Sequence, residues 1–484
     1  MSDNQDQHHF QRSLGLWDAT MLVAGSMIGS GIFIVSADMS RWVGSSGWLM
    51  FLWILSGVIT LIAALCYGEL AGMMPKAGGQ FVYIQRAYGN FTSFLYGWTV
   101  FTVIQTGVIA AVAVAFAKYT AVFIPWFSPQ NILITIGSIT ISAAQLLAIA
   151  LIVFLTWSNS QGIRNGKIVQ TVFTSAKLVS LLMLIVLGIY TGLHTNVFSN
   201  NLQGAWDAVQ LTQINGVWVE EHISGIALLL ALGTAMIGSL FSSDAWNNVT
   251  FIAAEIKDPK KNIPRSLLLG TGIVTILYCL ANIAYLSLLP LKGSSTATDV
   301  IGQGIQFAGG GTDRVGTAAA SMIFGDVAVY IMAALIMVST FGCNNGAILA
   351  GPRLYYAMAK EGLFFRRAGE LNKNDVPGFG LKVQAVWASL LCLSGTYGDL
   401  LNYVTFASLL FYMVTISGIF ILRKKEPDAE RPYKTVLYPF LPALYIVLAL
   451  SVCLILLYTT PGATGKGLLI VFLGAPVYFL VRKK

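Results

Sequence analysis

The chain has 484 residues, of which 56% are hydrophobic and only 10% are charged, and its mean hydropathy is +0.72. An ordinary soluble domain carries about 25% charged residues, so this composition does not suit a soluble protein. It also argues against a disordered chain, and the five cysteines sit in or beside apolar runs with no C-x-x-C pair, which argues against a disulfide scaffold or a zinc site.

A membrane-spanning helix needs about 20 mostly apolar residues. Stretches that meet or approach this length predict an all-α membrane protein with about twelve transmembrane helices. Little sequence is left over, so residues 1–484 are expected to form a single transmembrane domain. The predicted spans are 14–37, 46–70, 92–122, 132–156, 168–191, 223–253, 266–290, 326–358, 382–400, 401–422, 435–458 and 467–481.

The basic residues predict the orientation of these spans. If the N-terminus is cytoplasmic, the large majority of the 29 lysines and arginines fall in cytoplasmic segments. Cytoplasmic loops of membrane proteins carry such an excess. Both termini are therefore placed in the cytoplasm. The net charge of +8 is interpreted as a topology signal, and nucleic acid is not expected as a partner.

Two of the spans carry residues that weaken a helix at mid-depth. The first contains the glycine- and serine-rich segment 25–31, and the sixth contains segment 238–248 with Asp244. Backbone unwinds inside a membrane only where it is buried in protein or lines a wet cavity. Gly25-x-x-x-Gly29 by itself is also a helix-packing pattern. The paired clusters favour unwound helices 1 and 6 at a binding site.

The two interrupted spans lie five spans apart, and that spacing predicts two inverted structural repeats. An odd number of spans turns the second repeat upside down relative to the first, and broken helices at matching positions point to a transporter binding site. The expected architecture is a 5+5 inverted repeat plus two C-terminal helices. Its parts are 14–191, 223–422 and 435–481.

Unwound backbone at these positions suits a zwitterion. Free N–H groups near Gly29, with Ser30 and Gly31 as donors, would bind a carboxylate at the positive end of a helix dipole. Unpaired carbonyls at the end of the preceding half-helix would accept from an ammonium group. Those acceptors are expected near Met27 and Ile28, and around Phe241 and Ser242.

Motifs along nearly the whole chain resemble those of the amino acid–polyamine–organocation (APC) transporter superfamily, and most closely its L-type amino acid transporter branch. They occur in the family's order, and they are Gly25-Ser26-Met27-Ile28-Gly29-Ser30-Gly31-Ile32-Phe33, Cys66-Tyr67-Gly68-Glu69-Leu70, Pro75-Lys76-Ala77-Gly78-Gly79, Trp246-Asn247 with Glu255, Pro259, Asn262, Pro264 and Arg265, Arg353-Leu354 with Lys360-Glu361-Gly362, and Glu430-Arg431-Pro432. The resemblance implies amino-acid exchange by alternating access.

The resemblance also implies roles for single residues. Met27, Ser30 and Gly31 match substrate-contacting positions, Phe241 matches an aromatic gate above the substrate, and Ser408 is expected to line the side-chain pocket. By the same resemblance, Lys177 in the fifth span is expected to occupy the place that sodium takes in symporter relatives. Its ammonium would then tie span five to spans one and eight.

Lys177 has an alternative interpretation as a lysine that snorkels to the membrane surface. It lies ten residues beyond Lys167, about 15 Å deep at the rise of an α-helix, which disfavours snorkelling. A lysine at the bilayer centre costs about 2.5–3.5 kcal/mol on insertion scales, so its side chain should face the bundle interior. With its ammonium in the sodium position, as the resemblance implies, we expect sodium-independent transport.

Asp244 departs from many neutral-amino-acid members of the family, which carry glycine there. Three interpretations stay open: it pairs with a cationic substrate side chain, it accepts hydrogen bonds from a polar substrate or from Asn247 and Asn248, or it is a structural partner of the unwound backbone. The resemblance favours the first, because a branch with aspartate here handles dibasic as well as neutral substrates. Neutral and cationic amino acids are the expected substrates.

Partners, cofactors and competing functions follow from what the sequence lacks. The loop 124–130 has no cysteine, so the disulfide-linked heavy chain of animal relatives is not expected, and a stand-alone prokaryotic carrier in the inner cell membrane fits better. No metal or cofactor is expected. Alternatives are a polyamine or arginine–agmatine type antiporter and a proton-coupled permease; an enzyme or a channel fits poorly.

Glu69 and Glu255 are expected near Lys76 and Arg265, as charged helix ends or as an inner gate.

Overall fold

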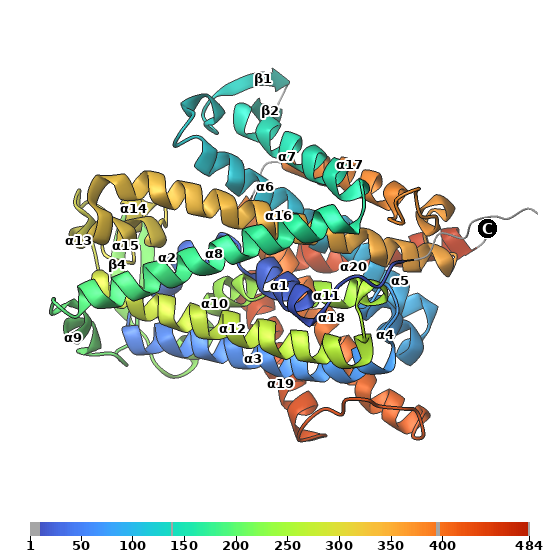
Figure 1. The fold of residues 1–484 in the computed structure, drawn as a ribbon. Helices are drawn as coiled ribbons and strands as arrows, with labels where there is room; N and C mark the ends of the chain where they lie inside the picture. Colours follow the sequence, from blue (N-terminus) through green and yellow to red (C-terminus); the bar gives the residue numbers. More distant parts are fainter. Residues whose placement is uncertain (1–9, 137–138, 394–396, 483–484) are drawn as a thin grey trace, which may run out of the picture.

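The computed structural model describes residues 10–136, 139–393 and 397–482 (Figure 1). Long helices run side by side through the molecule, and short elements gather at their ends. Within the described residues, ten helical segments are long and apolar enough to cross a membrane, and α17 is a shorter apolar helix. The chain is therefore a multi-pass helical membrane protein, as its composition predicts. The count of twelve spans and the inverted repeat stay predictions.

The first half of the chain contains long apolar helices, short helical turns and two β-hairpins. Its elements are α1 (Leu16–Met27), η1 (Gly31–Phe33), α2 (Val35–Val43), α3 (Ser46–Met73), α4 (Gln80–Tyr88), α5 (Asn90–Thr99), the π-turn η2 (Val100–Ile104), α6 (Gln105–Thr120), η3 (Pro125–Phe127), β1 (Ile132–Ile136), β2 (Ile139–Ser142), α7 (Ala143–Ser160), α8 (Ile163–Gly192), α9 (Val197–Leu202), β3 (Val209–Ile214) and β4 (Val217–His222).

The second half begins with the other interrupted helix. Its elements are α10 (Gly225–Ser242), α11 (Asn248–Phe251), η4 (Ala253–Glu255), α12 (Pro259–Leu288), α13 (Val300–Gln303), α14 (Ala308–Gly311), α15 (Val315–Phe324), η5 (Gly325–Val327), α16 (Ala328–Lys360), η6 (Arg366–Gly369), α17 (Gly378–Leu393), α18 (Tyr397–Lys425), α19 (Phe440–Thr459) and α20 (Pro461–Arg482).

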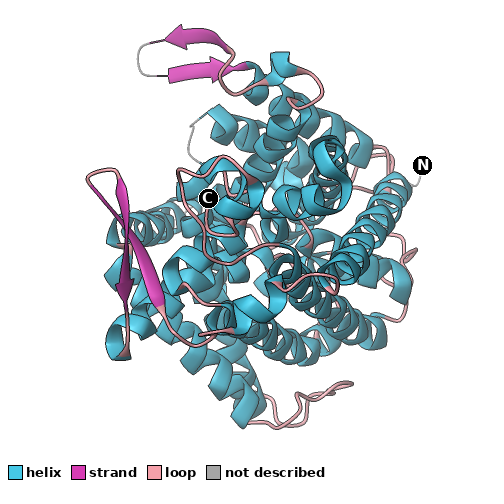
Figure 2. Cartoon of the chain, turned by 90° about the vertical axis from the view of Figure 1, so that its left-hand side faces the viewer, coloured by secondary structure: helices cyan, strands magenta, loops and turns pink. Residues whose placement is uncertain are grey.

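The prediction of a fourth span at 132–156 is wrong at its start. Residues 132–136 and 139–142 form the antiparallel strands β1 and β2, which stand at the edge of the helix bundle (Figure 2). The run of alternating isoleucine and threonine there has high β-propensity. The helix starts only at Ala143, where Ser142 and Gln145 form a capping box with a 2.7 Å hydrogen bond from Ser142 N–H to Gln145 Oε1.

The boundary between the ninth and tenth predicted spans is also placed differently. The prediction puts it at residues 400–401, whereas α17 ends at Leu393 and α18 begins at Tyr397. Residues 394–396, inside the predicted ninth span, lie outside the described residues.

The core that positions the site is built around α1. This helix packs against α8, α12 and α16, and α12 packs in turn against α3. Helix α8 has one buried and one exposed face. Lys177, Leu181 and Leu184 are buried, while Val179 and Val186 are 66% and 57% exposed. The exposed aliphatic face suits lipid, and the buried face is available for polar contacts inside the bundle.

Candidate functional site

The first helix is interrupted where its glycine and serine residues cluster. Helix α1 ends at Met27, Ile28 is in an extended conformation, and the chain resumes as the short η1 before α2. Glycine weakens a helix by its conformational freedom, and serine offers competing hydrogen bonds. The break is fully inside the protein, because residues 25–32 are all buried.

The sixth predicted span is interrupted in the same way. Helix α10 ends at Ser242, the next five residues are not helical, and α11 starts at Asn248. Ala245 adopts a φ of 64°. A positive φ is uncommon for a residue with a Cβ atom, and such strain of order 1–3 kcal/mol is concentrated at functional sites.

The two breaks touch each other. A Cβ atom at Gly31 would collide with the Ser242 hydroxyl, so only glycine permits this approach. Tyr278 of α12 joins them as well, because its hydroxyl lies 3.1 Å from the Met27 carbonyl and 3.0 Å from the Ser242 carbonyl. A phenol has one hydrogen, so the two breaks share a single donor. The sequence analysis missed Tyr278; the signal was a tyrosine in an apolar span, whose buried hydroxyl needs a partner.

Lys177 of α8 reaches the end of the first half-helix. Its ammonium donates to the carbonyls of Gly25 and Ile28, the latter at 2.7 Å, and lies 3.4 Å from the carbonyl of Ser339 on α16. The side chain is 3% exposed, so it does not snorkel. The fifth span is thereby joined to the first and the eighth.

Other side chains donate to the carbonyls of the first break. Cys343 lies 3.1 Å from the Ser26 carbonyl, and the Ser339 hydroxyl is 3.0 Å from the Ile28 carbonyl and 3.1 Å from that of Gly29. Of the carbonyls predicted to accept from a substrate ammonium, that of Met27 therefore has one protein donor and that of Ile28 has two. A carbonyl has two lone pairs, so the Met27 carbonyl retains room for a second donor.

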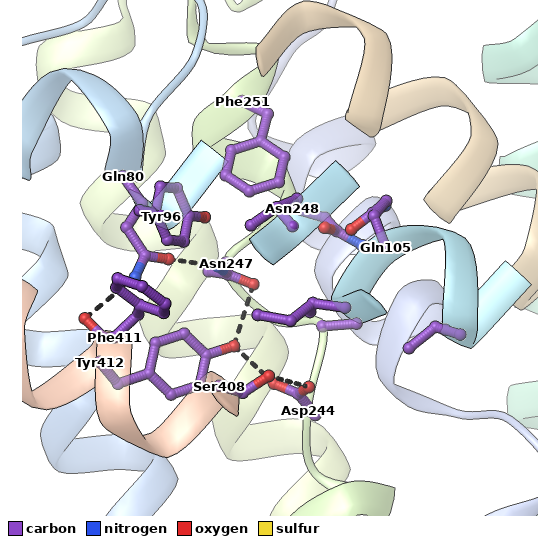
Figure 3. Close-up of a pocket in the computed structure, with 14 residues that line it drawn as sticks. Gln80, Tyr96, Gln105, Asp244, Asn247, Asn248, Phe251, Ser408, Phe411 and Tyr412 are labelled. Atoms are coloured by element: carbon purple, nitrogen blue, oxygen red, sulfur yellow. Dashed lines mark hydrogen bonds between the residues drawn. The ribbon is translucent and has the colours of Figure 1, made fainter. Parts of the chain in front are cut away.

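Asp244 in the second break faces α18 (Figure 3). Its carboxylate accepts from the hydroxyl of Tyr412 at 2.5 Å and from that of Ser408 at 3.3 Å, and from the amide of Ala245. The described residues provide no lysine, arginine or histidine within ion-pair distance of it. A carboxyl group held inside a membrane protein only by neutral hydrogen-bond donors is unusual, and such a residue is a candidate for a functional role.

A chain of hydrogen bonds extends from Asp244 into the protein. Tyr412 is also 3.3 Å from Asn247 Oδ1, Asn247 Nδ2 donates to Gln80 Oε1 at 3.0 Å, and Gln80 Nε2 donates to Thr415 at 2.9 Å. These side chains link α4, the second break and α18. The sequence analysis missed Tyr412 and Gln80; the signal was polar side chains inside or next to apolar spans.

Asp244 and Ser408 lie in one closed pocket beside the second break (Figure 3). The free space at its centre, about 20 Å³, has room for a water molecule but not for an amino acid. The π-turn η2 contributes to its wall, and π-turns within helices are frequent at functional sites. The lining residues are Gln80, Tyr96, Val100, Ile104, Gln105, Val108, Asp244, Ala245, Asn247, Asn248, Phe251, Ser408, Phe411 and Tyr412.

The predicted site residues thus fall into two groups. Asp244 and Ser408 line this pocket, whereas Phe241, Ser242 and residues 27–31 do not. The latter surround the contact between the two breaks. In the part of the chain that the structure describes, no cluster of three histidine, cysteine or acidic side chains is arranged to hold a metal ion.

Glu69 and Glu255 form ion pairs with arginines that are distant in sequence. Glu255 pairs with Arg353 of α16 at 2.7 Å, with both side chains buried, and Glu69 pairs with Arg423 of α18 at 2.7 Å. Lys76 and Arg265 are close in sequence, but helix packing brings other arginines to the buried carboxylates. Each carboxylate accepts two hydrogen bonds from its arginine, a geometry that the planar guanidinium provides.

Comparison with known proteins places the chain in a family. Residues 14–481 match the amino acid permease family. The chain is 30% identical over 477 residues to the large neutral amino acids transporter small subunit 2 of Mus musculus, covering 97% of this chain and 81% of the relative. It is 29% identical over 482 residues to the serine/threonine exchanger SteT of Bacillus subtilis, covering 99% of both chains.

A third relative is the b(0,+)-type amino acid transporter 1 of Mus musculus, which is 28% identical over 458 residues, or 93% of this chain and 84% of the relative. The family and these relatives are transporters and not enzymes. By its match over nearly the whole length, the chain belongs to the amino acid permease family and is an amino-acid transporter.

Proposed function

We propose that the protein exchanges amino acids across the inner cell membrane by alternating access and without sodium. The observation that carries this proposal is the position of Lys177, whose ammonium is bonded to the Gly25 and Ile28 carbonyls at the first break. A cation fixed there by the chain itself supplies the positive charge that backbone carbonyls at a broken helix attract. No coupling cation is then needed at that point.

The substrate's α-groups are proposed to bind where the two breaks meet. The amides of Gly29, Ser30 and Gly31 would face the carboxylate at the start of η1, where the backbone dipole favours an anion. The carbonyls of Met27, Phe241 and Ser242 would take the ammonium through their second lone pairs, and that of Ile28 would accept from it in place of one of its two protein donors. The Phe241 ring would close over the substrate as a gate.

Orientation, partners and substrates complete the proposal. Both termini are placed in the cytoplasm, in line with the basic loops, and the carrier works without a disulfide-linked heavy chain. The names of the three relatives specify large neutral amino acids, serine/threonine exchange and b(0,+)-type transport. We propose neutral and cationic amino acids as substrates for this chain.

The test is counterflow into proteoliposomes that contain the purified protein. Radiolabelled amino acid should enter vesicles preloaded with unlabelled amino acid much faster than empty vesicles, and replacing sodium by choline should leave the rate unchanged. Loss of uptake in choline would refute sodium independence, and equal uptake by empty vesicles would refute exchange. Uptake that requires an inward proton gradient would support a proton-coupled permease. Uptake of agmatine or polyamines alone would support a polyamine or arginine–agmatine type antiporter.

Substitution of Asp244 by asparagine is expected to weaken binding of cationic amino acids more than binding of leucine. The substitution keeps the side chain's shape and removes a carboxylate for which the described residues provide no ion-pair partner. Hydrogen bonds and contacts to charged groups contribute about 1.5–3 kcal/mol, so the affinity for lysine should fall by roughly tenfold or more. Competition of labelled uptake by lysine and by leucine measures both. An equal loss for the two substrates would assign Asp244 a structural role.

A further inference from the structure

A separate cavity lies at the end of the bundle where the chain enters α1. Its volume of about 450 Å³ falls within the range of roughly 300–1,000 Å³ that small-molecule pockets occupy. Its walls come from the segment before α1, the loop between α3 and α4, helix α4, η4 and the end of α16. None of its lining residues belongs to the pocket beside the second break, so the two are different sites.

Three basic side chains surround this cavity. They are Arg12 before α1, Lys76 in the loop between α3 and α4, and Lys360 in the last turn of α16. All three are exposed, and among the described residues none of them forms an ion pair. Glu361, the one acidic residue of the lining, accepts a hydrogen bond from Gln85 Nε2 at 2.9 Å. The cavity therefore presents three cations against one carboxylate.

Aromatic side chains form one wall of the cavity. The Phe10 ring packs edge-on against the Tyr356 ring, with the two centroids 5.0 Å apart. The Lys360 ammonium lies 5.3 Å from the centroid of the same Tyr356 ring. A cation at this distance from an aromatic face is attracted to it, so the ring helps to hold the ammonium beside the cavity.

The charge of the cavity indicates which kind of molecule it suits. Like charges around one cavity repel each other, and an anion between them offsets that repulsion. A phosphate monoester carries about −1.5 to −2 charges at neutral pH and has three strong acceptor oxygens, which matches an excess of two positive charges. A carboxylate carries a single charge and would leave part of the excess uncompensated. Arginine binds phosphate through two parallel hydrogen bonds, and lysine binds it as a point charge.

We propose that this cavity binds a phosphate-bearing anion and that the bound anion holds the segment before α1 against the end of α16. Arg12, Lys76 and Lys360 supply the contacts to the phosphate. Its source is either a soluble phosphate ester or the headgroup of an anionic lipid, since both present the same group to a basic pocket. The binding site stands independently of transport, whereas the effect on exchange rests on the proposed function.

A bound anion would connect segments that have to separate when the predicted cytoplasmic end opens. Arg12 directly precedes Ser13 and Leu14, whose amides donate to the Glu255 carbonyl at 3.0 and 3.1 Å. Lys360 is the last residue of α16. A phosphate between Arg12 and Lys360 would add a contact across this closed end, so exchange should become slower when the cavity is occupied.

The first test is calorimetric titration of the detergent-solubilised full chain with phenyl phosphate, a soluble phosphate monoester. Benzoate is the comparison, because it presents a single charge on the same ring. Phenyl phosphate should bind about tenfold more tightly than benzoate, and its affinity should fall as salt is added, since exposed charges are screened. Absence of binding, or equal affinity for the two compounds, would overturn the proposal.

The second test removes two of the three cations. The double variant Lys76→Gln with Lys360→Gln should bind phenyl phosphate about tenfold more weakly or worse, because two charged contacts are lost. The matched control is Lys424→Gln with Lys425→Gln, which changes the net charge equally at two exposed lysines of α18 that do not line the cavity. Its affinity should match that of the unsubstituted protein. Equal weakening in both double variants would assign the binding to general electrostatic attraction and overturn the site.

Thermal unfolding without phenyl phosphate shows whether each double variant is folded. If the variant with Lys76→Gln and Lys360→Gln is not, the single variant Arg12→Gln takes its place, with Lys424→Gln alone as its control. Arg12→Gln should weaken phenyl phosphate binding and the control should not. Unchanged binding in Arg12→Gln would then overturn the assignment.

The two sources of phosphate are separated in nanodiscs of phosphatidylcholine with and without cardiolipin. If a lipid headgroup fills the cavity, cardiolipin should reduce phenyl phosphate binding by the unsubstituted protein. If the natural anion is soluble, cardiolipin should leave that binding unchanged. Both results support a phosphate site, and they assign its source.

The effect on transport is measured by counterflow in proteoliposomes with phenyl phosphate on both sides. It should slow exchange by the unsubstituted protein and not by the variant with Lys76→Gln and Lys360→Gln. An unchanged rate at saturating phenyl phosphate would overturn the role in holding the two segments together. Because binding is measured without transport, a protein that binds phenyl phosphate but exchanges no amino acid would count against the proposed function and not against the site.

Discussion

Lys177→Met is expected to abolish amino-acid uptake and to lower the unfolding temperature. The substitution keeps a long side chain but removes the donor to the Gly25 and Ile28 carbonyls, deep in the bundle. A buried polar group left without its partner costs about 1–3 kcal/mol. The Gly25 carbonyl would lose its ammonium donor and the Ile28 carbonyl would keep only the Ser339 hydroxyl, both at the break that is proposed to hold the substrate. Proteoliposome uptake and thermal unfolding in detergent measure the two effects.

The control for this variant lies on the same helix. Lys167 of α8 pairs with Asp18 of α1 at 2.8 Å, and its side chain is 35% exposed. Exposed ion pairs contribute about 0–1 kcal/mol, so Lys167→Met should retain most of the uptake. Near-normal uptake by Lys177→Met would show that the first break does not depend on its ammonium and would remove the main support for sodium-independent transport.

Arg353→Met is expected to give the largest loss of stability outside the site. Its guanidinium pairs with the Glu255 carboxylate, and the two side chains are 0% and 2% exposed. Removing one partner of a buried ion pair leaves an uncompensated charge and costs about 3–5 kcal/mol. Thermal unfolding in detergent should show a large decrease in the transition temperature.

The double variant Arg353→Met with Glu255→Gln should recover much of this loss, because the unpaired charge is then absent. Arg86→Met provides a comparison, since Arg86 pairs with Glu426 in an exposed position, and a change of about 0–1 kcal/mol is expected there. If the double variant is as unstable as the sum of its single variants, the two side chains act independently and the buried pair is not the cause.

The Glu255–Arg353 ion pair also connects segments of the chain that lie near the ends of both broken helices. The carbonyl of Glu255 accepts from the amides of Ser13 and Leu14, just before α1, at 3.0 and 3.1 Å, and the amide of Lys257 donates to the Leu14 carbonyl at 2.8 Å. Arg353 connects the same point to α16. The segments before α1 and after η4 are thus held together at one end of the bundle, predicted to be the cytoplasmic end. In alternating access, these contacts would have to separate for a substrate to leave on that side.

The class of the protein and the position of its broken helices were accessible to sequence reasoning. Hydropathy over 20 residues is a local property, and so are the clusters of glycine, serine and aspartate that stop a helix at segments 28–30 and 243–247. The depth of Lys177 in its span likewise predicted a buried ammonium. The same local patterns failed at residues 132–136 and 139–142, where apolar residues form paired strands and not the start of a span.

The partners of the polar groups were decided by the tertiary structure alone. The chain has several arginines at helix ends that are equivalent in sequence terms, and only packing shows that Arg353 and Arg423 meet Glu255 and Glu69. Tyr278 meets both breaks because α12 crosses them, and Asn248 faces a pocket whose other walls come from α4, η2 and α18. Helix formation and membrane partitioning depend on neighbouring residues, whereas a binding pocket depends on distances between segments hundreds of residues apart.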